Sequence, residues 1–129
     1  MTTTTFRNEN VSETVVSYLS TLRTAIESYR SQHHEFPGRE GSEQFVSQLT
    51  AMTSENGQVG FGPNFPFGPY INDGTLPTSP ISGTHDVRVV SQMPTEPSGT
   101  EAWIYDWSTG EIHANATGET EAGTRFFDL

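Results

Sequence analysis

Apolar residues recur at helical spacing near the beginning of the chain. Serine, threonine, glutamate and arginine fill the positions between them, so that one side of the expected helix is polar. The pattern predicts an amphipathic helix from about Val11 to His34, capped by Asn10 and ended by Phe36-Pro37-Gly38, because the residue before a proline is pushed out of the helical region. The positions expected to be buried are Val11, Val15, Leu19, Leu22, Ile26 and Tyr29.

A second, shorter helix is expected from Glu43 to about Thr53, with Ser42 as its N-cap. The composition then changes, and residues 56–83 are so rich in proline and glycine that neither a helix nor a central strand fits them. Aromatic residues within this stretch argue against disorder. We therefore predict an ordered connection held down by Phe61, Phe65, Phe67, Tyr70, Ile71 and Leu76.

The last third of the chain has the composition of strands. Residues 85–91 are rich in the β-branched residue valine, which favours a strand. Residues 101–116 have the pattern of a hairpin that turns at Ser108-Thr109-Gly110. Trp103, Tyr105 and Trp107 alternate onto one face of this hairpin. The elements together predict an α+β fold in which the long helix packs on a small antiparallel sheet. We expect one globular domain over residues 11–129, preceded by residues 1–10 that are disordered or were added for expression.

Charge and composition exclude several classes of protein. The formal net charge is -10, there is no lysine, and the arginines are scattered singly, so a nucleic-acid partner is not expected. The absence of cysteine excludes disulfides and thiolate metal sites. The sequence contains no apolar run of the length that a membrane span or a signal peptide needs, which predicts that the chain is soluble as given.

No catalytic constellation is visible, and we predict that the chain is not an enzyme. Phosphate-binding glycine loops, nucleophile elbows and zinc-protease motifs are missing from the sequence. The histidines are interpreted as surface or turn residues: His33, His34, His85 and His113. A calcium ion could take oxygen ligands from Asn72, Asp73 and Thr75, or from Glu119 with Glu121, but solvated acidic loops are the favoured interpretation. No cofactor and no metal ligand is therefore predicted.

Three stretches, taken in order, carry a resemblance to a known family. They are "LSTLRTAIESYRSQHHEFPG", "FGPYINDGTLPTSPISG" and "AWIYDWSTGEIHAN". In sequence and spacing they resemble the pseudopilins of the type II secretion system, above all the G-type major pseudopilin and its type IV pilin-like relatives. The likeness runs from Val11 to about Asn115. It implies a pilin-like fold in which the first stretch is the C-terminal half of a long helix and the last is the final hairpin.

The resemblance also implies a function and a location. The chain would be a structural subunit of a periplasmic fibre that supports protein secretion, with other pseudopilins and the secretion machinery as its partners. The full-length form would be anchored in the inner membrane by an apolar half-helix that this sequence lacks, which favours truncation as its origin. Without that segment we expect a monomer or weak dimer. The family's calcium-loop motif, an Asp-Pro-Trp-Gly-like segment, is not matched.

Two further expectations concern surfaces. Within a fibre, polar contacts between neighbouring subunits are expected to join Arg23 and Arg30 to the acidic residues Glu119 and Glu121. The alternative function is a stand-alone adhesion or ligand-binding module that would use Trp107 and the Phe61–Tyr70 loop.

Overall fold

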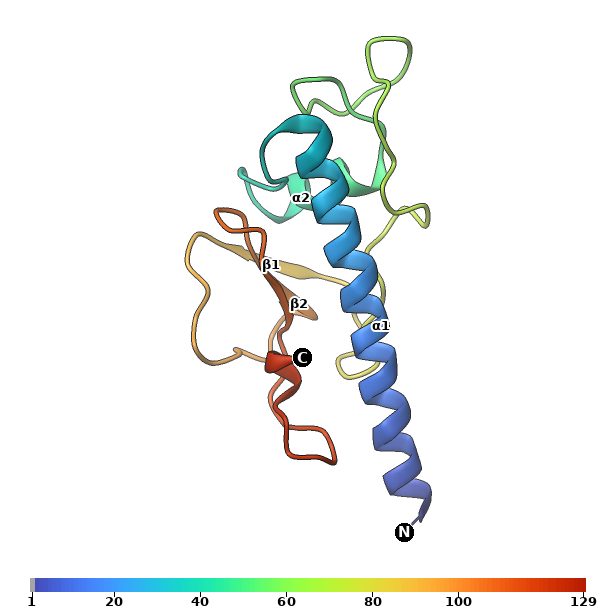
Figure 1. Ribbon diagram of the computed structural model, residues 1–129, viewed down its shortest axis with the longest axis vertical. Coiled ribbons are helices and arrows are strands. Elements are labelled where there is room, and N and C mark those ends of the chain that lie inside the picture. Colours follow the sequence, from blue (N-terminus) through green and yellow to red (C-terminus); the bar gives the residue numbers. More distant parts are fainter. Residues whose placement is uncertain (1) are drawn as a thin grey trace.

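The computed structural model describes the backbone of residues 2–129 and the side chains of residues 11–129. In chain order its elements are the helices α1 (Thr2–His33) and α2 (Ser42–Thr50), the strands β1 (Val87–Val90), β2 (Trp103–Asp106) and β3 (Ile112–Ala114), and the 3₁₀ turn η1 (Phe126–Asp128). Helix α1 runs along the longest axis of the molecule, and the sheet lies on one side of it (Figure 1). The predicted α+β class is confirmed.

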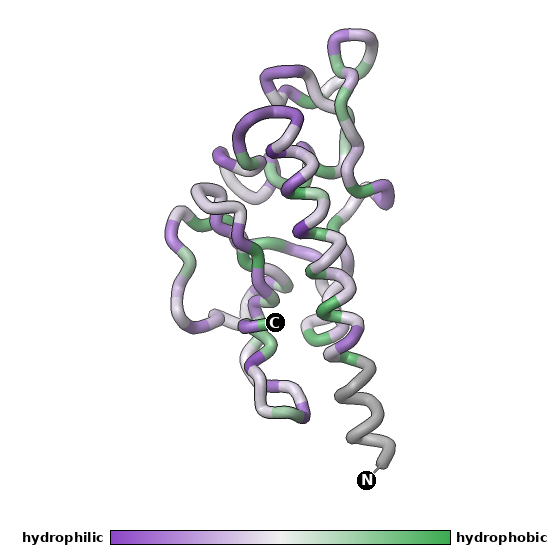
Figure 2. The backbone as a smooth tube through the Cα atoms, viewed as in Figure 1, coloured by the Kyte–Doolittle hydropathy of each residue, from purple (hydrophilic) through white to green (hydrophobic). Residues whose placement is uncertain are grey.

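The buried side of α1 is the one that the apolar pattern predicted. Val15, Leu19, Leu22, Ile26 and Tyr29 are each at most 1% exposed. In the coloured part of α1 in Figure 2, hydrophobic and hydrophilic residues are interspersed, as expected for a helix with one buried side. The burial of this stripe against the sheet holds the helix in the domain.

Both ends of α1 differ from the expectation. The helix begins at Thr2 rather than near Val11, and it ends at His33 because His34 adopts the left-handed conformation, with φ of 65°. The His34 amide donates to the Arg30 carbonyl, which closes the last turn before the proline is reached. The expectation that residues 1–10 are disordered or were added for expression falls outside the described side chains and stays a prediction.

Helix α2 begins one residue earlier than predicted. Its N-cap is Gly41 rather than Ser42, and no side chain caps it. Gln48 on its buried side joins two loops, because its side chain accepts from the Gly38 amide and donates to the Gly57 carbonyl. The helix is therefore fixed by a buried amide as well as by Phe45 and Leu49.

The sheet is mixed, and the prediction of a small antiparallel sheet is wrong in this respect. The strand order is β1-β2-β3, with β2 parallel to β1 and antiparallel to β3. Two parallel strands need a crossover connection that returns the chain to the end of the sheet at which the first strand began. Residues 91–102 form this connection without a helix. The Ala102 amide donates to the carboxylate of Asp86, which ties the end of this connection to the start of β1.

The central strand β2 is buried on both faces. Trp103 and Tyr105 face the core shared with α1, where the Tyr105 ring lies 4.1 Å from the ring of Phe45. On the other face Ile104 pairs with His113 of β3, and the His113 ring stacks on Phe127 of η1 with centroids 4.9 Å apart. The C-terminal turn thus covers the face of the sheet that α1 leaves open.

The glycine- and proline-rich connection is held down by fewer side chains than predicted. Ile71 and Leu76 are buried in the core, and Phe65, Phe67 and Tyr70 are half-buried. Phe61 is 90% exposed, so its predicted role in pinning the loop is wrong. Among the residues that the structure describes, no helix has the length and apolar character needed to cross a membrane.

Candidate functional site

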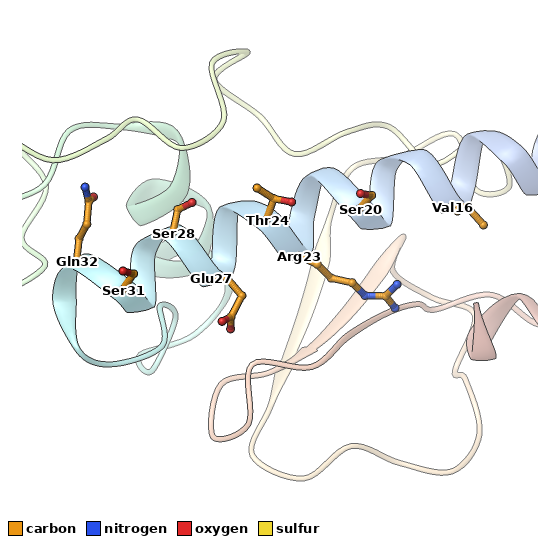
Figure 3. A pocket seen from close by; sticks show the side chains of 8 residues that line it. All are labelled: Val16, Ser20, Arg23, Thr24, Glu27, Ser28, Ser31 and Gln32. Carbon is orange, nitrogen blue, oxygen red and sulfur yellow. The ribbon is translucent and has the colours of Figure 1, made fainter.

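The open side of α1 forms a shallow groove lined by small and polar side chains. Figure 3 shows them along the helix: Val16, Ser20, Arg23, Thr24, Glu27, Ser28, Ser31 and Gln32. The lining residues are exposed, and the one large apolar residue among them, Val16, is 49% exposed. Short side chains let another backbone approach the helix axis closely. This face therefore suits contact with a second extended element better than binding of a compact ligand.

Arg23, which was expected to contact a neighbouring subunit, forms hydrogen bonds within its own chain. One of its guanidinium nitrogens donates to the carbonyl of Ile112 at 3.0 Å and to that of Leu129 at 2.8 Å. In Figure 3 its side chain extends from α1 toward the C-terminal segment, away from the line of serines. Partial burial lowers the pKa of Arg23 from its usual value. The residue ties β3 and the C-terminus to the helix.

The other three residues of the predicted assembly surface do not meet Arg23 in one chain. Arg30 lies over the ring of Phe36, with its guanidinium carbon 5.0 Å from the ring centroid. Glu119 and Glu121 are exposed in the loop that follows β3. Their proposed contact with arginines of a neighbouring subunit stays a prediction.

His33 is buried, although the sequence predicted a surface or turn residue. It is 8% exposed, and its ring stacks on Tyr29 with centroids 4.0 Å apart. One ring nitrogen lies 3.1 Å from the Thr53 hydroxyl and 3.2 Å from that of Tyr70, and the other lies 3.3 Å from the Glu55 carbonyl. The interpretation of His33 as a surface residue is wrong, because it joins the end of α1 to the loop after α2. Its spacing of four from Tyr29 was a usable signal.

The remaining histidines do not converge. His34 and His85 are exposed, and His113 stacks on Phe127 while one of its nitrogens lies 2.7 Å from the Phe127 carbonyl. Within the described residues, no group of three or more histidine, cysteine or acidic side chains could hold a metal ion. The suggested calcium ligands Asn72, Asp73 and Thr75 are exposed loop residues.

The aromatic residues of the alternative function lie in different surroundings. Trp107 is half-buried, and the guanidinium carbon of Arg39 lies 5.3 Å from the centroid of its ring. Phe61 is the most exposed of the large hydrophobic residues between positions 11 and 129. One face of the Trp107 ring is therefore occupied by a cation of the same chain.

Comparisons of the chain with models of protein families, with curated proteins and with solved structures found no match.

Proposed function

We propose that this chain is a structural subunit of a helical fibre of the pseudopilus or type IV pilus kind. It would be the globular part of a subunit that acts in the periplasm, anchored in the inner membrane in its full-length form, and its partners would be other subunits of the fibre and the secretion machinery. The proposal extends the resemblance of three stretches in the sequence, and the α+β layout with one long N-terminal helix is compatible with it.

The observation that carries the proposal is the division of α1 into two unlike sides. One side is buried in the domain, where Leu19 and Leu22 are fully enclosed. The opposite side presents Ser20, Thr24 and Ser28 in a groove that nothing in the described residues fills. A helix whose free face is small and polar can pack against copies of itself without exposing an apolar patch beforehand.

The test enlarges the small side chains of that face in the complete gene, expressed in its own cell. Ser20→Arg with Ser28→Arg should block close approach of a neighbouring helix while leaving the domain folded, because both positions are exposed. Fibres are counted by electron microscopy, and secreted protein is measured in the medium. Thr78→Arg with Gln58→Arg adds the same charge at exposed positions outside α1 and is the matched control.

Loss of fibres and secretion in the helix variant alone supports the proposal. Fibres that form normally with both variants contradict helix-mediated assembly. A complete reading frame that carries a conventional signal peptide in place of a prepilin leader would contradict it as well, and would favour the alternative of an adhesion or ligand-binding module.

A further inference from the structure

Two arginines near the end of α1, among the residues whose side chains the structure describes, have no hydrogen-bond or ion-pair partner. Arg23 donates to two carbonyls, Arg88 pairs with Glu101, and Arg125 pairs with Glu96 and Asp128. Among the residues whose side chains the structure describes, Arg30 and Arg39 are the arginines that have neither a carboxylate nor a carbonyl acceptor. In a chain with 16 acidic and 6 basic residues, such arginines are unexpected on electrostatic grounds.

Arg30 and Arg39 line the same cavity, near the end of α1. Each guanidinium lies over an aromatic ring, Arg30 over Phe36 at 5.0 Å and Arg39 over Trp107 at 5.3 Å. Stacking of this kind fixes the plane of the guanidinium and leaves its N–H edge free to donate. Two oriented, unpaired guanidinium groups at one cavity are suited to binding a carboxylate through two parallel hydrogen bonds.

The other charged or titratable groups of the cavity are His34 and Glu35. No hydrogen bond or ion pair joins Glu35 to either arginine within the described residues, so it does not neutralise the pair. Ser108 lies at the same cavity, and its hydroxyl donates to the carboxylate of Asp106 at 2.6 Å. With the histidine neutral, the cavity therefore keeps a formal charge of one positive unit.

The size of the cavity favours a side chain over a larger ligand. Its volume is about 270 Å³, below the ~300–1,000 Å³ of typical small-molecule sites. One carboxylate side chain fits such a space. The chain itself carries exposed, unpaired carboxylates in the loop after β3, at Glu119 and Glu121. In Figure 1 this loop is the red one near the lower end. The end of α1 and the tip of the β2–β3 hairpin, which carry residues that line the cavity, lie toward the other end of the long axis.

We propose that the cavity of Arg30 and Arg39 receives the acidic loop of a second copy of this chain, with Glu119 or Glu121 as the inserted carboxylate. The inference rests on the proposed function and names one of its contacts. Because the two surfaces lie toward opposite ends of the molecule, the contact is head-to-tail and can repeat without closing, which is the geometry of a filament. Arg39 takes the place that Arg23 was expected to hold.

Disulfide trapping tests the contact directly, because the chain has no cysteine of its own. Ser108→Cys on one copy and Ala122→Cys on another place thiols beside the cavity and in the acidic loop, both at exposed positions. Equimolar, concentrated mixtures under mild oxidation should give the mixed dimer. Thr78→Cys with Ala122→Cys is the matched control, and its yield of mixed dimer should be about tenfold lower. Equal yields from the two mixtures would overturn the proposal.

Charge exchange gives a second readout. Arg30→Glu with Arg39→Glu in the Ser108→Cys copy should lower the trapped yield about tenfold, and Glu119→Arg with Glu121→Arg in the Ala122→Cys copy should restore it. High salt should lower the yield of the unchanged pair. Thermal melts of each variant check that the domain remains folded. Lost trapping without restoration in folded variants would overturn the charge pairing.

Two outcomes separate this contact from the proposed function. If the arginine variant forms normal fibres in the cell while Ser20→Arg with Ser28→Arg does not, the cavity contact is wrong and the fibre function stands. If free glutarate saturates the cavity but no mixed dimer is trapped, the cavity binds small carboxylates and the second copy is excluded as its occupant.

Discussion

The guanidinium of Arg23 donates to the backbone carbonyl of Leu129 at 2.8 Å, which joins α1 to the last residue of the chain. The same group donates to Ile112 in β3 at 3.0 Å. One cation thus connects the helix, the edge strand and the C-terminus. This explains why α1 and the C-terminal turn can enclose the sheet from its two faces.

Replacing Arg23 should therefore destabilise the domain. Arg23→Gln removes two charge-assisted hydrogen bonds, and we expect the free energy of unfolding to fall by ~1–2 kcal/mol, measured by urea denaturation. Arg88→Gln is the control, because Arg88 lies 3.7 Å from Glu101 at an exposed site and its loss should cost ~0.5 kcal/mol or less. Equal losses in the two variants would mean that the Arg23 contacts do not hold the C-terminus.

The buried stripe of α1 predicts a larger effect. Leu22 and Ile26 are 0% and 1% exposed, so that replacing either by alanine leaves a cavity against the sheet. We expect a loss of ~2–5 kcal/mol for each, measured by urea denaturation. Ser20→Ala, on the open side of the helix, should change the stability by less than ~0.5 kcal/mol. A cost at Leu22 as small as that at Ser20 would contradict the packing of α1 on the sheet.

His33 should behave as a structural residue. His33→Ala leaves the hydroxyl of Thr53 without its ring partner and removes the ring that stacks on Tyr29. The expected loss is ~1–3 kcal/mol in the free energy of unfolding, and His85→Ala, at an exposed position, should be close to neutral. Amide exchange that stays unchanged at Thr53 and Glu55 in the His33 variant would argue against the contact between α1 and the loop.

The elements that sequence predicted well are those with local causes. The three- and four-residue spacing from Val15 to Tyr29 fixes both the helix and its buried side. The hairpin turn predicted at Ser108-Thr109-Gly110 is present, and Gly110 is left-handed there, with φ of 81°. In each case the conformation is determined by residues that are close together in the sequence, and such local patterns can be recognised without a structure.

The features that sequence missed depend on distant partners. Arg23 reads as an exposed helix residue because its acceptor Leu129 lies 106 positions away. The parallel pairing of β1 with β2 depends on the path of residues 91–102, which carry no periodic pattern. His33 continues the stripe four residues beyond Tyr29, but its partner Thr53 lies 20 positions away in the sequence. The open groove on α1 was likewise hidden, since polarity alone does not show which polar face remains uncovered.

Two tyrosines should make the domain sensitive to alkali. Burial raises the pKa of Tyr29 to about 12, with smaller contributions from Glu35 and Tyr70, and burial raises that of Tyr105 as well. The unfolded chain gives up these protons near pH ~10, whereas the folded chain retains them. Stability is therefore full below pH ~10 and falls as the pH rises toward the raised values of the folded state.

The measurement is the free energy of unfolding between pH 9 and 12, together with tyrosinate absorbance of the folded protein. Tyr29→Phe should give a shallower decline over this window, because phenylalanine has no proton to lose. Tyr105→Phe should also flatten the decline, but from a lower starting stability, since the hydrogen bond from Tyr105 to the Pro37 carbonyl is lost. If the free energy of unfolding declines equally with pH in the unchanged protein and in the two variants, the raised pKa values are contradicted.

Gly110 at the β2–β3 turn should tolerate no side chain. Its φ of 81° is unfavourable for other residues, and a Cβ there would collide with the ring of Phe36. The guanidinium of Arg30 stacks on the same ring. Gly110→Ala should therefore cost ~2–4 kcal/mol, the sum of backbone strain and overpacking. Gly74→Ala separates the two effects, because Gly74 has φ of 78° but open space around it.

The control should lose only ~1–2 kcal/mol, the cost of a left-handed alanine. The difference between the two variants then measures the contact of the turn with Phe36. Phe36→Leu in the Gly110→Ala background should recover part of that difference, because the smaller side chain can move away. If Gly110→Ala lowers the free energy of unfolding in urea no more than Gly74→Ala does, the tip of the hairpin does not contact Phe36 closely, and the cavity of Arg30 and Arg39 lacks a firm wall on that side.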